Sequence, residues 1–118
     1  MKFLFFFLFL FALPSTDKVV EWISPVEHDF GDLQQNSPAT HKFKFKNTTD
    51  EPLIIENVRS TCGCTGVDWE DDVIAPGEEG VIKIEFDTKK LGFFYKKINV
   101  FFNAQRKPEK LAITGYVE

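Results

Sequence analysis

The sequence alternates between apolar and polar residues over several short stretches, and this alternation is the feature that most restricts its fold. The clearest stretch ends at Lys46, where His41, Phe43 and Phe45 alternate with lysines. Successive side chains of a β-strand point to opposite faces, so this stretch has one apolar and one charged face. Nowhere does apolar spacing of three and four persist for ten residues, so we expect no substantial helix.

About seven short strands are expected, with turn signals between them. They are predicted at 26–30, 41–46, 53–59, 67–70, 81–86, 93–102 and 111–117. Gly31-Asp32 is expected to close the first strand, and Pro76-Gly77 to form the centre of a type II turn. This number of strands in roughly a hundred residues is typical of an immunoglobulin-like antiparallel β-sandwich.

The first residues form a charged, an apolar and a polar segment in the same order as in a secretory signal peptide. Lys2 supplies a positive start, residues 3–13 are an unbroken apolar run, and Pro14 begins a turn-forming polar segment. The run falls short of the about 20 residues of a membrane-spanning helix. We therefore expect a signal peptide at 1–16 and one domain at 17–118, with no stable membrane span after the signal is removed. An uncleaved anchor and a buried strand are the alternatives.

Charge and export restrict the partners. Removal of residues 1–15 takes one of the 14 basic residues and none of the 18 acidic ones, which leaves a net charge of −5. This balance argues against nucleic acid or an anionic lipid surface as a partner. Outside the cytosol, the two cysteines are expected to be oxidised, metal-bound or otherwise paired.

Cys62, Gly63 and Cys64 form the most unusual motif of the chain. In a flat strand, residues two apart point the same way with Cα atoms about 6.6 Å apart, close to the upper limit of about 6.8 Å for a disulfide. A glycine between them allows a tighter backbone. Three interpretations stay open: a redox-active disulfide, two thiolates that chelate Cu(I) or Zn(II), or thiols that pack at a strand end.

A metal site would need further ligands. His28 and His41 are the only histidines, and they fall in phase with Phe30 and Phe43 on apolar faces. Such histidines are expected to be core groups, and no zinc-finger spacing is present. No cofactor is therefore expected, and a metal at Cys62 and Cys64 remains the less favoured alternative.

Other polar clusters have simpler interpretations than catalysis. The acidic cluster after the cysteines lacks the alternation and the glycine of a calcium loop, and it is interpreted as a solvated loop; its members are Asp68, Glu70, Asp71 and Asp72. Lysines 42, 44 and 46 are interpreted as the outer face of a strand. Thr61 or Thr65 would need a base to act as a nucleophile, and no motif supplies one, so no enzyme activity is expected.

A set of short motifs resembles the exported bacterial domain of unknown function 1573. The motifs are Asp29-Phe30-Gly31, 43–47, Pro52-Leu53, Cys62-Gly63-Cys64-Thr65, Trp69, Pro76-Gly77-Glu78, Phe86-Asp87-Thr88, Gly92 and 111–115. The resemblance implies an immunoglobulin-like sandwich akin to Hydin and major-sperm-protein domains, export by Gram-negative bacteria, and no established catalytic activity.

Together these features predict a non-enzymatic β-sandwich in the periplasm or on the cell surface of a Gram-negative bacterium. Its expected role is to bind or support another envelope protein or a glycan through an exposed aromatic or edge-strand surface, and main-chain pairing at an edge strand is the mode we expect. The alternative is a thiol protein that binds Cu(I) or exchanges disulfides through Cys62 and Cys64.

Overall fold

A computed structural model describes residues 18–70 and 72–118, which contain strands and no helix. The predicted signal peptide and Asp71 lie outside the described residues. The strands are β1 (Val20–Trp22), β2 (Glu27–Leu33), β3 (Ala39–Asn47), β4 (Ile55–Ser60), β5 (Thr65–Trp69), β6 (Glu79–Phe86), β7 (Gly92–Phe102) and β8 (Glu109–Val117). The all-β prediction is confirmed.

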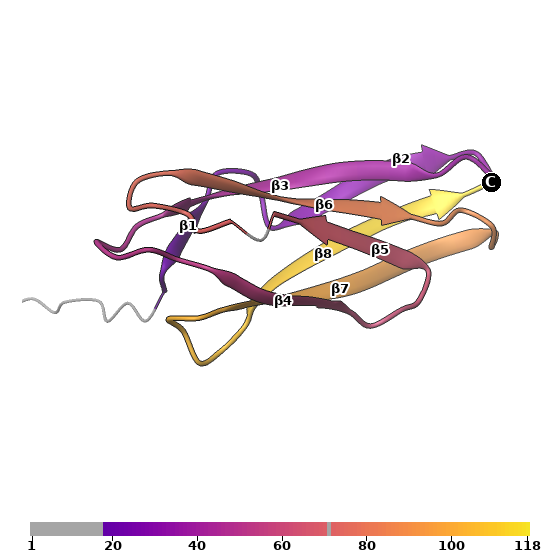
Figure 1. The fold of residues 1–118 in the computed structure, drawn as a ribbon. Helices are drawn as coiled ribbons and strands as arrows, with labels where there is room; N and C mark the ends of the chain where they lie inside the picture. Colours follow the sequence, from indigo (N-terminus) through magenta and orange to yellow (C-terminus); the bar gives the residue numbers. More distant parts are fainter. Residues whose placement is uncertain (1–17, 71) are drawn as a thin grey trace, which may run out of the picture.

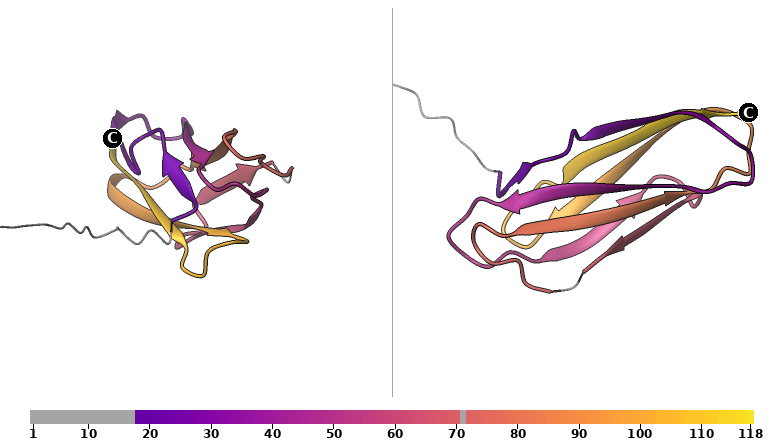
Figure 2. Two further views of the ribbon diagram at one scale, coloured as in Figure 1. Left: turned by 90° about the vertical axis from the view of Figure 1, so that its left-hand side faces the viewer. Right: turned by 90° about the horizontal axis from the view of Figure 1, so that it is seen from above.

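The strands form two four-stranded sheets that pack face to face (Figures 1 and 2). Sheet A has the order β1-β3-β6-β5, and sheet B has the order β2-β8-β7-β4. The predicted immunoglobulin-like sandwich is confirmed, with one difference: β2 pairs with β8 in parallel, whereas every other strand pair is antiparallel. These two strands are far apart in the sequence, so no hairpin forces them to be antiparallel.

The core follows from the alternation in the sequence. Phe43 of β3 lies directly opposite Ile82 of β6, and both are fully buried, while the intervening lysines are exposed. Sheet B contributes its own inward side chains, which include Ile98, Val100, Phe102, Leu111 and Ile113. Burial of one such side chain stabilises the fold by about 1.5–3 kcal/mol, so the packed layers hold the sandwich together.

Two glycines at positive φ show how the turn signals are used. Gly77 has φ 81°, and the N–H of Glu78 donates to the carbonyl of Ala75 at 2.9 Å, as the predicted turn requires. Gly31 has φ 71°, but β2 does not end there as predicted. Its pairing with β8 shifts register and resumes at Asp32, so this glycine forms a β-bulge.

Two segments also differ from the prediction. The short apolar segment before residue 26 contributes β1, so there are eight strands where about seven were expected. Leu53 pairs only with Ile74 in an isolated bridge, and β4 begins at Ile55.

The topology leaves two open sides on the sandwich. β1 and β2 lie at one side, and β4 and β5 at the other. Because β4 and β5 belong to different sheets, the segment between them must cross from sheet B to sheet A, and it contains both cysteines.

Candidate functional site

Residues 61–64, which we call the cysteine turn, form backbone hydrogen bonds with both sheets. The N–H of Thr61 donates to the carbonyl of Lys97 in β7 at 3.2 Å. On the other side, the N–H of Asp87, just after β6, donates to the carbonyl of Cys64 at 2.9 Å. The turn is therefore placed by the two sheets that it connects.

The structure joins Cys62 and Cys64 in a disulfide with Cα atoms 5.2 Å apart. This separation is shorter than the about 6.6 Å of a flat strand, so the backbone has contracted at the turn. Both cysteines are half-buried, and Cys64 packs against the hydrophobic core. Because a metal ligand must be a thiolate, the pair would have to be reduced before it bound Cu(I) or Zn(II).

A hollow opens beside the disulfide. Gly63 and Cys64 line it together with residues of the loop before β3 and of the loop after β6, and its volume is about 370 Å³. Apart from the two neighbouring cysteines, no residue has an atom within 4 Å of the position that a Cβ on Gly63 would take. The turn therefore faces open space, and a side chain of another molecule has room to approach it.

The structure brings the two histidines together on the other side of the sandwich. The rings of His28 in β2 and His41 in β3 stack with centroids 3.7 Å apart, and Phe30 and Phe43 pack edge-on against them. Both histidines are half-buried, so they lie at the margin of the core on which they were expected. The disulfide lies at the β4 and β5 side, so no combined cysteine–histidine site forms.

The environment of His41 disfavours its charged form. Its Nε2 is buried without a hydrogen-bond partner. Burial lowers the pKa of His41 from 6.5, and the neighbouring His28 lowers it further. The pairing of these two histidines had no signal in the sequence beyond their shared phase with phenylalanines.

The remaining predicted polar groups stay apart. Asp68, Glu70 and Asp72 are exposed, and Asp68 lies opposite Lys83 of β6. Across residues 18–70 and 72–118, no group of three or more histidine, cysteine, aspartate or glutamate residues is placed to hold a metal ion. Thr61 is exposed, and the Thr65 hydroxyl is buried without a hydrogen-bond partner.

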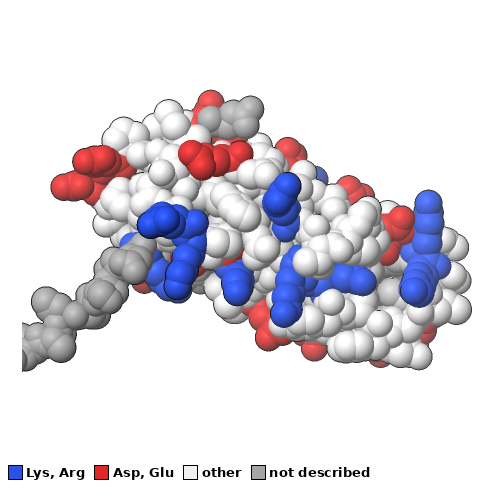
Figure 3. All heavy atoms as spheres, turned by 90° about the horizontal axis from the view of Figure 1, so that it is seen from below, with Lys and Arg blue, Asp and Glu red and all other residues white. Residues whose placement is uncertain are grey.

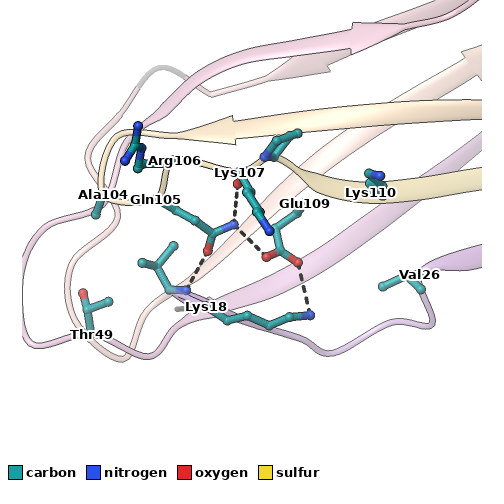
Figure 4. Close-up of a pocket in the computed structure, with 11 residues that line it drawn as sticks. Lys18, Val26, Thr49, Ala104, Gln105, Arg106, Lys107, Glu109 and Lys110 are labelled. Carbon is teal, nitrogen blue, oxygen red and sulfur yellow. Dashed lines mark hydrogen bonds and ion pairs between the residues drawn. The ribbon is translucent and has the colours of Figure 1, made fainter. Parts of the chain in front are cut away.

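A larger hollow of about 990 Å³ lies between the start of β1 and the β7–β8 loop (Figure 4). Its floor is the buried carboxylate of Glu109, which accepts hydrogen bonds from Trp22 Nε1 at 2.9 Å and from Gln105 Nε2 at 2.8 Å. Lys18 pairs with this carboxylate at 3.7 Å, and the N–H of Val19 donates to Gln105 Oε1 at 3.0 Å. These polar groups are hydrogen-bonded or ion-paired with one another, so the cluster holds β1 against the β7–β8 loop.

Three aromatic side chains are exposed on the outer face of sheet B, and we call them the outer aromatic patch. They are Phe93, Tyr95 and Tyr116, with exposed fractions of 71%, 46% and 48%. Phe93 lies directly opposite Tyr116 on the neighbouring strand. The sequence carried a signal for this patch, because Phe93 and Tyr95 are out of phase with the inward residue Phe94.

The comparison with family models decides the classification. A protein family of unknown function, DUF1573, matches residues 22–117. The chain belongs to this family. No curated protein matches it by sequence.

Solved structures similar to this family member share its fold at low identity. A protein of unknown function from Porphyromonas gingivalis W83 is 16% identical, with a TM-score of 0.71 over 83% of this chain and 46% of that one. The chain thus spans about half of that protein's length. The ASH/PapD-like domain 7 of human CEP192 is 8% identical, with a TM-score of 0.73 and 93% of each chain covered. WR4, a major-sperm-protein family member from C. elegans, is 9% identical, with a TM-score of 0.56 over 85% of this chain and 98% of that one.

Proposed function

We propose that this protein is an exported, non-enzymatic β-sandwich that binds another protein or a glycan of the bacterial cell envelope. The observation that carries the proposal is the outer aromatic patch. Exposed apolar side chains scattered singly are ordinary, but adjacent aromatic rings on one sheet face mark an interaction surface. Phe93 and Tyr116 are such neighbours, since they form a cross-strand pair.

Export is supported by the sequence, whose apolar run at residues 3–13 has the features of a signal peptide. Among the described residues, none forms a helix long and apolar enough to cross a bilayer. The absence of enzyme activity remains an expectation. It is supported by the separation of the two histidines from the cysteines and the threonines that flank them.

The test uses the protein without residues 1–16 as bait in an envelope extract of the bacterium that encodes it. We expect a captured partner that is lost when Phe93 and Tyr116 are both replaced by serine. The matched control is Val81→Ser, which removes an apolar side chain, 37% exposed, from sheet A. No partner above background, or equal capture by the Phe93 and Tyr116 double variant, would end the proposal.

A second candidate function is thiol–disulfide exchange at Cys62 and Cys64. The observation that favours it is the half-buried disulfide beside a hollow. In this reaction the thiolate of a partner dithiol attacks one sulfur, the bond between the two cysteines breaks, and a mixed disulfide forms. The partner's second thiol then releases this protein in its dithiol form, and the partner leaves oxidised.

Thiol titration separates this candidate from the first. The purified protein is titrated before and after dithiol treatment, with and without Cu(I), beside a Cys62→Ser, Cys64→Ser double variant. Exchange predicts two thiols that appear and disappear reversibly, and copper binding predicts Cu(I) uptake by the reduced form only. A variant with lower stability but unchanged partner binding would instead assign the disulfide a structural role.

A further inference from the structure

We infer that the first half of β7 is a docking strand for an extended, acidic peptide segment of a partner protein. The inference rests on the proposed function and names the class of partner. It follows from the way in which β4 leaves sheet B, from the direction of the free backbone groups, and from the charges around them.

β4 covers only the second half of β7. Their pairing runs from Ile55 to Ser60, and Ser60 lies opposite Ile98. Beyond this point the cysteine turn carries the chain to sheet A, while β7 continues back to Gly92. The segment from Phe93 to Lys97 is therefore paired with β8 on one side and with no strand on the other.

The direction of the backbone groups follows from two hydrogen bonds. The carbonyl of Phe94 faces β8, where it accepts from the Thr114 hydroxyl at 3.0 Å. The carbonyl of Lys97 faces the opposite side, where it accepts from Thr61 at 3.2 Å. Backbone groups alternate along a strand of regular register, so the N–H and carbonyl of Tyr95 point to the free side.

A free strand edge accepts an extended peptide by main-chain pairing, and side chains beside it set the specificity. In this protein the side chains of Phe93, Tyr95 and Lys97 share the outer face, because they occupy alternate positions of β7. A peptide that adds a strand at this edge would therefore place every second side chain beside the rings of Phe93 and Tyr95 or beside Lys97. The outer aromatic patch and the free edge together form one surface.

The lysine and arginine side chains around the edge favour an acidic peptide, and the carboxylate of Glu27, which lines the same hollow as Tyr95, acts against them. Figure 3, seen from the side of β4 and β7, shows a band of Lys and Arg side chains along the molecule with acidic side chains at its margins. Lys97 is exposed on the outer face, and Lys96 is half-buried next to it. Lys110 and Arg59 lie opposite Asn99 from the two neighbouring strands. An acidic segment would meet these cations where β4 ends.

The peptide is expected to run antiparallel to β7, in line with β4. Ser60 and Thr61 already lie opposite Ile98 and Lys97, so the peptide pairs with β7 from Lys96 to Phe93. Its apolar residues lie two apart, beside Tyr95 and Phe93, and the acidic residues before them leave the edge next to Lys96 and Lys97. The probe that represents this pattern is the dye-labelled synthetic peptide Glu-Glu-Glu-Phe-Thr-Phe-Thr, blocked at both ends.

The experiment measures fluorescence anisotropy of this probe with the protein lacking residues 1–16. We expect saturable binding that weakens as salt is raised, and no comparable binding of Lys-Lys-Lys-Phe-Thr-Phe-Thr. Amide hydrogen exchange at Tyr95 should slow on binding. The Lys97→Glu variant should bind at least severalfold more weakly, whereas Lys44→Glu, which reverses an exposed lysine of β3 in sheet A, should not.

Backbone methylation of the probe tests the pairing without changing the protein. The N–H of its first phenylalanine would donate to the Tyr95 carbonyl, so N-methylation there should weaken binding at least about tenfold. N-methylation of the threonine between the phenylalanines is the matched control, because that N–H would point away from β7. Equal effects of the two methylations would overturn the inference.

The remaining outcomes separate this inference from the function on which it rests. Absence of probe binding overturns the docking strand, as does binding of peptidoglycan fragments at the patch in place of the peptide. If the bait still captures an envelope partner through Phe93 and Tyr116, the proposed function stands while the docking strand falls. If capture and probe binding both fail, both proposals fall.

Discussion

The rings of His28 and His41 stack face to face across the two sheets, with an angle of 9° between their planes. His28 belongs to sheet B and His41 to sheet A, so the contact closes the β2 and β3 side of the sandwich. Two neutral rings pack well in this geometry, but two charged rings would repel each other. We therefore expect acid to weaken this contact.

The first prediction concerns the stability of the fold in acid. Because the pKa of His41 is lowered from 6.5, the unfolded chain binds a proton at pH values where the folded chain does not. The contribution of His41 to stability is therefore complete above its unfolded pKa. It is lost as the pH falls through that value towards the lower folded pKa. Urea unfolding between about pH 8 and pH 5 measures this loss.

The matched variant is His41→Phe, which keeps an aromatic ring in the stack and cannot be protonated. Its urea midpoint should fall less between the two pH values than that of the native chain. If the urea midpoints of the two proteins fall equally, groups other than His41 cause the loss of stability in acid.

The second prediction concerns Tyr95 in the outer aromatic patch. The negative charge of Glu27 raises the pKa of Tyr95 above 10.0, with smaller contributions from desolvation and from a hydrogen bond to the same carboxylate. The chain has two tyrosines, so in a Tyr116→Phe background the tyrosinate absorbance reports Tyr95 alone. Addition of Glu27→Gln should lower this pKa towards 10.0. An unchanged titration would show that the carboxylate does not act on the phenol.

Local alternation was enough to predict which residues face the core. Phe43 and Ile82 are buried opposite each other because each lies on the apolar face of its own strand, and that face is visible in a few consecutive residues. The glycine at position 31 also indicated a backbone with positive φ, but positive φ occurs both in turns and in β-bulges. Its neighbours in space decided between them.

The features that bear on function depend on which strands become neighbours. The histidine stack requires β2 and β3 to face each other, and the free half of β7 exists because β4 leaves sheet B at Ser60. The sequence left three interpretations of the cysteine pair open. The contraction that allows the disulfide arises where the chain crosses between sheets, and a two-residue spacing alone does not show it.

The third prediction concerns the contact between Gly80 and Phe45. A Cβ on Gly80 would overlap the fully buried Phe45 ring, so Gly80→Ala forces the core to shift. Such overpacking costs about 1–3 kcal/mol, which urea unfolding measures. The matched control is Gly66→Ala, also at a strand position, where the nearest atom would lie at an ordinary 3.7 Å. A Gly80→Ala variant as stable as this control would contradict the packing.

The fourth prediction concerns Asn47, which is 1% exposed at the end of β3. Its Nδ2 donates to the carbonyls of Glu51 and Ile74, both at 2.9 Å. Its Oδ1 accepts from the N–H of Thr49 at 2.9 Å and from the hydroxyl of the same residue at 2.7 Å. One side chain thus satisfies backbone groups of the β3–β4 turn and of the segment before β6.

Replacement of Asn47 by alanine leaves these backbone groups without partners. A buried group that loses its hydrogen bond costs about 1–3 kcal/mol, so Asn47→Ala should be among the most destabilising polar substitutions in the chain. The matched control is Asn103→Ala. Asn103 Oδ1 accepts from the N–H of Ile54 at the same 2.9 Å, but this asparagine is exposed and water can replace it. If urea unfolding shows equal losses for the two variants, burial does not set the cost, and Asn47 is not what holds the turn.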